Sequence, residues 1–436
     1  MSSVCVVVPS WAYWKDPLKL QPLWELYYAT FMEDRLSGVS VEMFDLRAAA
    51  ASGETPDVAD IPEHDVYFYW VMKSADALEV YDVVRRLRAK YPRSLHFAGG
   101  NHVDRCTDEA SEVFDVSLVG TAEELIVRAF DDLAAGRLQS VYRSAERFHF
   151  SEYGHARREF LPAARIVNDQ HFSQYGGFAG TGVYFSRGCS FGCRFCVYNN
   201  PSKFEYRTPE QIPAEIEYLK RTYGVEGVNL RDEVCVPVSP KTGLPYLEAI
   251  GKGGVAWRGQ TVTIASEELV KAAAESGCRE LALGLENVES DDVLRIINKP
   301  SKSVAANRAF IELLKKYGIR VKVCLIFGLP GETSAVVDRT IRFLEEVEPD
   351  YVAVSGFDPV PGSPIYENAE AYGIQWIDKD LSKHAHLVYR FGDDEDVGLP
   401  FAYAEHTPWG PGRRRHEIVA DIRTIQGYLR DRGMSY

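Results

Sequence analysis

The sequence predicts an α/β protein built from a doubly wound parallel sheet, a partial (β/α)6 barrel and a small irregular C-terminal segment. Strands and helices alternate along most of the chain, which is typical of parallel sheets. The first expected strand, residues 3–9, is a continuous apolar run, as in strands buried on both faces. The chain has 436 residues, 46% of them hydrophobic, which is enough for two to three domains with their own cores.

The first series of elements occupies residues 1–136. Sheets of this kind bind ligands at the carboxyl ends of their strands, where the connecting loops gather. We therefore expect any ligand of this part near those loops. The expected strands are residues 3–9, 39–46, 66–72, 94–98 and 116–120, and the expected helices are residues 23–36, 75–90 and 121–135.

A connector, residues 137–178, leads to the second series at residues 179–365. Its six strands, with helices between them, predict the incomplete barrel. Residues 366–436 are less regular and end in a helix at 416–431. Thr208 and Gln211 form a capping box that starts the first barrel helix. The expected strands are residues 182–186, 227–231, 255–261, 279–285, 321–327 and 351–356, and further helices are expected at 266–277, 304–317 and 334–347.

Charge and hydropathy exclude several classes of partner. The chain has 49 basic and 63 acidic residues and a formal net charge of −14, which argues against nucleic acid or an anionic membrane as the main partner. No run of 18 apolar residues occurs, so no membrane span is expected. The first residues lack a basic region and are typical of a strand rather than a signal peptide.

Three cysteines on one short loop carry the strongest chemical signal. Cys189, Cys193 and Cys196 have C-x3-C-x2-C spacing and follow the strand expected at 182–186. Three thiolates can hold three irons of a cubane 4Fe–4S cluster and leave the fourth iron open. A structural zinc site usually has four protein ligands, and no fourth cysteine is near. The alternative is three unrelated buried cysteines. A cluster, together with too few cysteines for a disulfide scaffold, predicts a cytoplasmic protein.

This loop, including the aromatic Phe195, resembles the signature of the radical S-adenosylmethionine superfamily. The resemblance implies that the open iron binds the amino and carboxylate groups of S-adenosyl-L-methionine. Reduction, by a partner such as flavodoxin or ferredoxin, then yields a 5′-deoxyadenosyl radical. The cofactor supplies this chemistry, and the protein supplies position and exclusion of water.

The same resemblance implies contacts with S-adenosyl-L-methionine at the ends of the barrel strands. Asp232 and Glu233 stand where the family holds the methionine amino group, although a solvated surface pair is the alternative. Glu286 matches a position that accepts from the ribose hydroxyls or the amine. The family's usual arginine is replaced by valine, which leaves Gln260 or Arg258 as candidates for the carboxylate.

Three further residues in the barrel are candidates for the site. Ile326 and Gly328 resemble the family's segment beside the adenine, although the glycine there also fits a simple turn. Cys235 follows the acidic pair and is a candidate hydrogen-atom donor or substrate contact. A buried cysteine without a chemical role is the more common case.

The N-terminal part resembles the cobalamin-binding domain that precedes many barrels of this superfamily. Gly99, Gly100 and Gly120 carry the resemblance, because glycine lets a bulky nucleotide tail approach the backbone. The alternative is a glycine-rich strand end of any α/β domain. No histidine follows the first strand, so cobalamin would be held without a histidine ligand, next to Trp11 and Trp70. These aromatic residues could instead fill the space where cobalamin would lie.

The residues and the resemblance together predict a radical enzyme. The favoured reaction is cobalamin-dependent methylation of an unactivated carbon of a small biosynthetic substrate. One alternative is a radical cyclisation, oxidation or rearrangement without methyl transfer. Another is an iron–sulfur protein that senses redox state. A methylthiotransferase is not favoured, because the N-terminal part lacks three cysteines of its own.

Overall fold

The computed structural model describes residues 2–11, 17–19, 21–47, 56–144, 146, 149–168, 170–198, 204–384 and 398–435. The chain divides into two compact units, Met1–Gly182 and Val183–Tyr436. The finer division into four segments that the sequence suggests stays a prediction. Among the described residues, no helix has the length and apolar character needed to cross a lipid bilayer.

The first unit contains a six-stranded parallel sheet with the order β2-β1-β3-β4-β5-β6. The chain moves one way from β1 to β2 and the other way from β3 onward. The point between β1 and β3 is therefore the switch point, outside which such sheets bind ligands. The strands are β1 (Ser2–Val8), β2 (Val39–Asp45), β3 (Val66–Trp70), β4 (Leu95–Gly99), β5 (Val116–Gly120) and β6 (Val141–Ser144).

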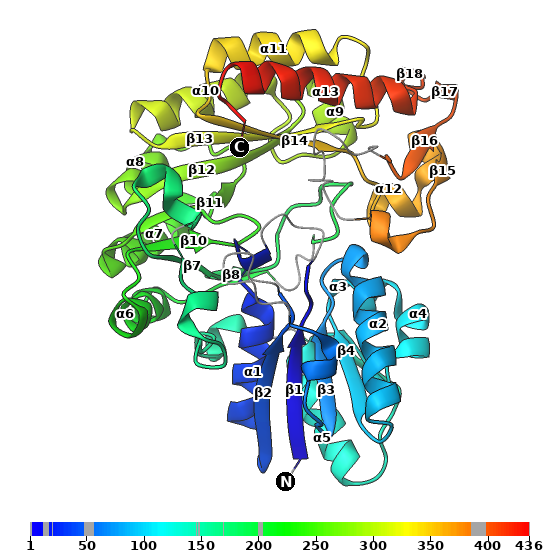
Figure 1. Cartoon of the computed structure of the whole chain (residues 1–436). Coiled ribbons are helices and arrows are strands. Elements are labelled where there is room, and N and C mark those ends of the chain that lie inside the picture. The colour runs from blue at the N-terminus through cyan, green and yellow to red at the C-terminus, as the bar shows by residue number, and fades with distance from the viewer. Residues whose placement is uncertain are drawn as a thin grey trace. The chain divides into compact units, whose positions relative to one another are not determined.

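The faces on which the first two helices lie follow from this reversal. Because parallel crossovers are right-handed, steps in opposite directions place their helices on opposite faces. Figure 1 shows α1 and α2 on opposite sides of the sheet. Helix α5 departs from this rule, because it packs against α1 although the step from β5 to β6 runs in the same direction as the step from β3 to β4. The helices are α1 (Leu23–Arg35), α2 (Ser74–Lys90), α3 (Asn101–Arg105), α4 (Thr107–Val113) and α5 (Ala122–Ala134).

The strand β6 corrects the expectation of an irregular connector at residues 137–178. It has four residues and pairs with β5, from Ser117–Val141 to Gly120–Ser144. A segment this short has no periodicity of its own. Its strand conformation comes from hydrogen bonds to a neighbouring strand, so the sequence pattern does not reveal it.

The second unit contains a six-stranded sheet with the order β14-β13-β12-β11-β10-β7, as the sequence predicts. All neighbours from β10 to β14 are parallel. The first strand ends earlier than expected, at Val183, and the two-residue strands β8 (Ser186–Arg187) and β9 (Glu205–Tyr206) then pair antiparallel. The other strands are β7 (Gly180–Val183), β10 (Gly227–Leu230), β11 (Ala256–Thr261), β12 (Cys278–Glu286), β13 (Arg320–Phe327) and β14 (Tyr351–Gly356).

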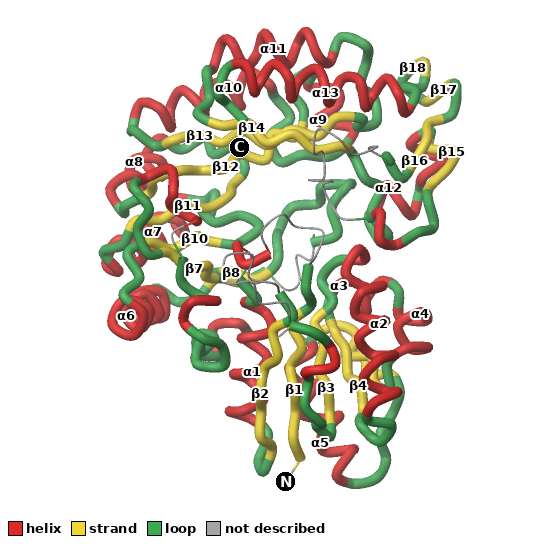
Figure 2. The backbone as a smooth tube through the Cα atoms, viewed as in Figure 1, coloured by secondary structure: helices red, strands yellow, loops and turns green. Residues whose placement is uncertain are grey.

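Helices line the outer side of this second sheet (Figure 2). Neighbouring helices pack in chain order, α6 on α7, α7 on α8, α8 on α10 and α10 on α11. The predicted capping box forms, because Thr208 and Gln211 exchange side chain-to-backbone hydrogen bonds of 3.0 and 3.3 Å. The helices are α6 (Gln211–Tyr223), α7 (Pro240–Gly253), α8 (Glu267–Glu275), α9 (Asp291–Ile296), α10 (Val304–Lys316), α11 (Val336–Val347), α12 (Pro364–Glu367) and α13 (Arg415–Asp431).

Helix α7 is absent from the sequence prediction because its prolines and glycines are typical of loops. Pro240 is in the first turn, where proline is tolerated. A Cβ at Gly243 would lie 2.6 Å from Leu269 of α8, and one at Gly253 would lie 2.5 Å from Ile216 of α6. These glycines therefore permit close packing between helices rather than a turn.

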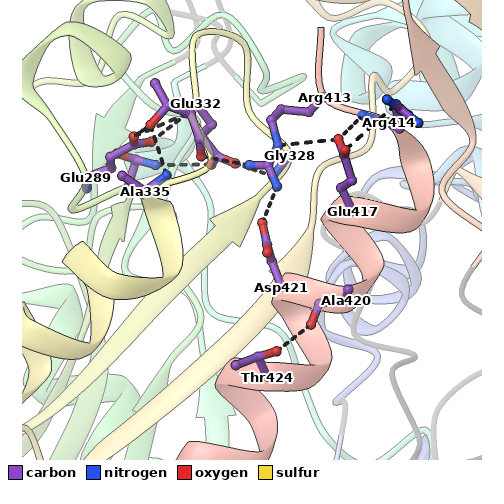
Figure 3. A network of polar contacts seen from close by, with 12 residues as sticks. Glu289, Gly328, Glu332, Ala335, Arg413, Arg414, Glu417, Ala420, Asp421 and Thr424 are labelled. Atoms are coloured by element: carbon purple, nitrogen blue, oxygen red, sulfur yellow. Dashed lines mark hydrogen bonds and ion pairs between the residues drawn. The ribbon is translucent and has the colours of Figure 1, made fainter. Parts of the chain in front are cut away.

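The C-terminal segment joins the second unit through polar contacts with the turn after β13 (Figure 3). Tyr403 donates a hydrogen bond of 2.8 Å to the carbonyl oxygen of Gly328. Arg413 donates to the carbonyl oxygen of Thr333 at 2.8 Å and pairs with Asp421 of α13 at 2.5 Å. The expected final helix is confirmed as α13, which packs on β14 and α11.

A buried histidine pairs with the turn after β14. His384 Nδ1 lies 2.8 Å from Asp358 Oδ1, and Nε2 lies 2.9 Å from the carbonyl oxygen of Asp378. Burial alone lowers the pKa of His384, but the hydrogen bond to Asp358 and its charge outweigh burial, and the pKa lies above the ordinary 6.5. Because both ring nitrogens face acceptors, the imidazolium form fits this site.

We expect the His384–Asp358 pair to stabilise the fold at low pH. Because the folded pKa is raised, its contribution is complete below about pH 6.5 and is lost as pH rises through the folded pKa. His384→Gln should lower the free energy of unfolding by about 1.5–3 kcal/mol at pH 6 and by less at pH 8.5. Anaerobic denaturant titrations measure this, with the exposed His416→Gln as control. An equal loss at both pH values would contradict the assignment.

Candidate functional site

The three cysteines lie on the loop that follows β8. Gly188 has a φ of +75°, which lets the chain turn sharply between β8 and the first thiol. All three thiols are partly buried, and burial raises the pKa of Cys189 to about 11 and that of Cys196 to about 12. Burial thus disfavours bare thiolates, whereas a metal deprotonates a coordinating thiol outright. The donor set fits a metal cluster held by three thiolates.

Asp232 supports the start of this loop. Its Oδ1 atom accepts hydrogen bonds from the Phe185 amide at 3.0 Å, from the Ser186 hydroxyl at 2.6 Å and from the Ser186 amide. The side chain is fully buried, and burial raises the pKa of Asp232 to about 7. Asp232 thus holds the backbone that leads into the cysteines, and its expected contact with S-adenosyl-L-methionine stays a prediction.

Glu233 is the member of the acidic pair that lies next to the thiols. Its side chain is partly exposed, unlike that of Asp232, and burial raises the pKa of Glu233 to about 8. Its negative charge contributes to the raised pKa values of Cys189 and Cys196. A carboxylate in this place can accept hydrogen bonds from an ammonium group.

The end of helix α9 supports the other side of the cysteine loop. The amide of Asn298 donates to Arg295 O at 3.1 Å and that of Lys299 to Leu294 O at 2.9 Å, which is the hydrogen-bond pattern of a Schellman motif. Asn298 has a φ of +53°, which asparagine tolerates better than most residues. Its side chain donates to the carbonyl oxygen of Gly192 at 2.8 Å.

Two further hydrogen bonds join the cysteine loop to the same helix end. The amide of Arg194 donates to Ile297 O at 2.9 Å, and its guanidinium donates to Ile296 O at 3.1 Å. Residues 192 and 194 flank the second thiol, Cys193. The last carbonyls of α9 therefore serve as acceptors for the loop.

A buried ion pair lies beside the thiols. Lys299 Nζ is 3.1 Å from Glu286 Oε1, and the two side chains are only 7% and 10% exposed. The same ammonium is 5.9 Å from the centre of the Phe195 ring. Its charge opposes the rise in the pKa of Cys193 that burial causes. Glu286 and Phe195 are thus brought to the cysteine loop as the sequence predicts, and Lys299 is a residue that the sequence did not indicate.

Glu286 has an uncommon backbone conformation. Its φ is +64°, and the register of β12 against β13 shifts between Gly284 and Glu286. A non-glycine residue in this region costs of order 1–3 kcal/mol, and such residues cluster at functional sites. The bulge turns the strand end so that the carboxylate meets Lys299.

The two candidates for the carboxylate of S-adenosyl-L-methionine differ in exposure. Arg258 is buried and pairs with Glu280 of the neighbouring strand β12 at 2.5 Å. Gln260, near the end of β11, is exposed. The charge of Arg258 is therefore already balanced by Glu280. The exposed side-chain amide of Gln260 is accessible to a ligand and could donate hydrogen bonds to its carboxylate.

The remaining barrel candidates are packed against the protein itself. Ile326 is buried, and Gly328 has a φ of +91°. A Cβ at Gly328 would lie 2.9 Å from Ile418 of α13, so packing of the C-terminal segment already requires glycine. Cys235 is fully buried, and its Sγ lies 2.7 Å from where a Cβ at Gly259 would be. This arrangement favours a packing role for Cys235.

Contacts within the first unit also explain why glycine is required at the three positions that the sequence indicates. Gly100 and Gly120 have φ values of +111° and +106°. A Cβ at Gly100 would lie 2.5 Å from Val71 O, and one at Gly120 would lie 2.0 Å from Ser144 O. A Cβ at Gly99 would lie 2.8 Å from the Trp70 ring. Close contacts within the unit therefore account for all three, without a ligand.

Aromatic residues gather at the carboxyl end of β3. The Trp70 ring lies 4.3 Å from the Tyr28 ring and 6.3 Å from the Trp24 ring, both of α1. Its buried Nε1 atom has no hydrogen-bond partner among the described residues. Trp11, just after β1, is partly exposed and has a φ of +47°. Both predicted tryptophans thus lie at the ends of the two strands that flank the switch point.

Part of the second unit matches a known protein family, and several known proteins are similar to this chain in sequence. Residues 183–344 match the Radical SAM superfamily. Bacteriochlorophyllide d C-8(2)-methyltransferase of Chlorobaculum tepidum is 24% identical, over 76% of this chain and 74% of that protein. An uncharacterized methyltransferase of Pyrococcus horikoshii is 28% identical over 44% of this chain, which spans 42% of that protein. Anaerobic magnesium-protoporphyrin IX monomethyl ester cyclase of Rubrivivax gelatinosus is 29% identical, over 42% of this chain and 34% of that protein.

Solved structures share the fold over almost the whole chain. The radical S-adenosylmethionine methyltransferase TsrM from Kitasatospora setae, with cobalamin and a [4Fe-4S] cluster bound, has a TM-score of 0.69 at 16% identity, covering 98% of this chain and 91% of that one. The cobalamin-dependent radical enzyme OxsB with aqua-cobalamin has a TM-score of 0.68 at 12% identity, covering 98% and 67%. The predicted fold class is confirmed. With the cysteine loop at its start, the segment 183–344 is a radical SAM domain, which confirms the resemblance that the loop indicated.

Proposed function

We propose that this protein is a radical S-adenosylmethionine methyltransferase that uses cobalamin to methylate an unactivated carbon of a small biosynthetic substrate. The observation that carries the proposal is the cysteine loop with Glu233, Glu286 and Lys299 gathered around it. The similarity to a methyltransferase over three quarters of the chain supports the reaction type.

The residues of the second unit would divide the work of binding. Cys189, Cys193 and Cys196 would hold a 4Fe–4S cluster, which with S-adenosyl-L-methionine supplies the 5′-deoxyadenosyl radical when bound. Glu233 would accept from the methionine amine, because it lies beside the thiols and is partly exposed. Glu286 would accept from the same amine or from the ribose hydroxyls. Asp232 would keep the loop backbone in place through its three hydrogen bonds.

Support for cobalamin comes from the first unit. Its strand order gives a switch point between β1 and β3, and Trp11 and Trp70 lie at the carboxyl ends of these strands. Without a histidine after β1, cobalamin would be held with its lower face against protein side chains. The TsrM and OxsB structures have cobalamin or aqua-cobalamin bound, which is consistent with this proposal.

A second candidate is radical cyclisation without methyl transfer. It is favoured by the similarity to the anaerobic magnesium-protoporphyrin IX monomethyl ester cyclase. Both reactions begin with the same radical, so the cysteine loop does not distinguish them. Formation of S-adenosylhomocysteine distinguishes them, because it accompanies methyl transfer only.

Replacing any of the three thiols should abolish the cluster. Anaerobically reconstituted Cys189→Ala, Cys193→Ala and Cys196→Ala should lack the iron and sulfide of the wild type and form no 5′-deoxyadenosine. Cys106→Ala, in the first unit, serves as the control and should keep both. A loop variant that retained full iron and activity would show that its thiol is not a ligand. A wild type with a cluster but no 5′-deoxyadenosine would instead support a sensor.

The wild-type chain should bind a corrinoid. After incubation with hydroxocobalamin, the protein should leave gel filtration with the corrinoid absorption bands. Trp70→Phe should shift these bands, because the ring lies at the expected edge, while Trp376→Phe, which changes a 42% exposed residue, should not. A protein that keeps its cluster but lacks the corrinoid bands would exclude both cobalamin and the methyl transfer that depends on it.

A further inference from the structure

The ion pair of Lys299 and Glu286 lies beside the cysteine loop. We propose that Lys299 is a positioning residue whose fixed ammonium raises the reduction potential of the cluster held by the loop, and that Glu286 moderates this effect. The inference rests on the proposed function, because it requires a cluster on Cys189, Cys193 and Cys196.

Backbone hydrogen bonds fix the position of the Lys299 main chain. Lys299 follows Asn298 in the Schellman motif of α9, and its amide is bonded to Leu294 O at 2.9 Å. Pro300 comes next and restricts the chain further. The same motif holds the cysteine loop through the hydrogen bond from Asn298 to Gly192. Lysine and loop are thus attached to one rigid element.

Neighbouring side chains fix the position of the Lys299 ammonium group. It is 3.1 Å from Glu286 Oε1, 5.9 Å from the Phe195 ring and 3.5 Å from the position of a Cβ at Gly284. The residue is buried, so water screens its charge little. Phe195 sits between two of the cysteines in sequence. The charge of Lys299 therefore acts on the loop at close range and with weak screening.

The sign of the effect follows from the charge of the reaction. A reductant such as flavodoxin or ferredoxin gives one electron to the cluster, and the net charge of the cluster becomes more negative by one unit. A nearby cation stabilises the more negative state and raises the potential, and a nearby anion lowers it. Net charge around a cluster is one of the factors that set its potential.

Stability alone does not require this pair. A buried ion pair can often be replaced by apolar residues of similar volume with no loss of stability. Here the pair also depends on a Glu286 backbone in the left-handed region, which is costly in itself. A strained buried pair next to three thiols is therefore better explained by an effect on what the thiols hold.

The test is a potentiometric titration of the reconstituted full-length protein, without S-adenosyl-L-methionine, followed by electron paramagnetic resonance. Lys299→Met should lower the midpoint potential, and Lys299→Arg should keep it near the wild-type value. Glu286→Gln should raise it, because the ammonium then acts unopposed. The double variant Lys299→Met/Glu286→Gln removes one charge of each sign and should lie between the two single variants.

Two controls separate charge from structure. Lys302→Met removes an exposed lysine three residues further along and should leave the potential unchanged. Asn298→Gly keeps a residue suited to the left-handed conformation but removes the amide that bonds to Gly192. It should release iron to a chelator faster than the wild type, with a smaller change in potential than Lys299→Met.

An unchanged midpoint in Lys299→Met would overturn the proposal. If Lys299→Met fails to hold a cluster, the decision passes to Glu286→Gln, which retains the lysine, and a midpoint equal to or below the wild-type value would then refute it. Failure of the wild type itself to assemble a cluster would instead contradict the proposed function, so the two failures are distinguishable.

Discussion

The cysteine loop depends on hydrogen bonds that fix it from two sides. Before the first thiol, the buried carboxylate of Asp232 accepts from the backbone of Phe185 and Ser186. Around the second thiol, the end of α9 bonds to Gly192 and Arg194. A loop with glycines at positions 188 and 192 has many conformations open to it, and these contacts remove most of them. The sheet and α9 thus preorganise the three thiols.

Several glycines of this protein permit close packing. The turn after β13 shows this, because Gly328 accommodates Ile418, while its carbonyl accepts from Tyr403 and its amide donates to Glu332 at 2.7 Å. Burial raises the pKa of Glu332 to about 8. The C-terminal segment therefore contributes directly to the shape of a strand end in the second sheet, and a change in that segment would be felt at the turn.

The sequence predicted what is encoded locally and missed what depends on distant contacts. The thiols of Cys189, Cys193 and Cys196 are close because they are close in sequence, and long apolar periods such as that of α13 are visible directly. Lys299 was missed because only folding brings it to the loop, and nothing in its own segment marks it. Helix α7 and strand β6 were missed because tertiary packing overrides their local signals. Asp232 was assigned by position, and its burial could not be read from the sequence.

Two left-handed residues frame the pair that completes the site. Glu286 at the end of β12 and Asn298 just after α9 have φ values of +64° and +53°. The conformation of Glu286 directs its own carboxylate, and that of Asn298 positions the next residue, Lys299. The ammonium of Lys299 lies 3.1 Å from the carboxylate of Glu286. Asparagine suits this conformation, and glutamate does not. The unfavourable backbone therefore lies on the acidic partner, whose side chain cannot be exchanged for glycine without leaving the buried lysine unpaired.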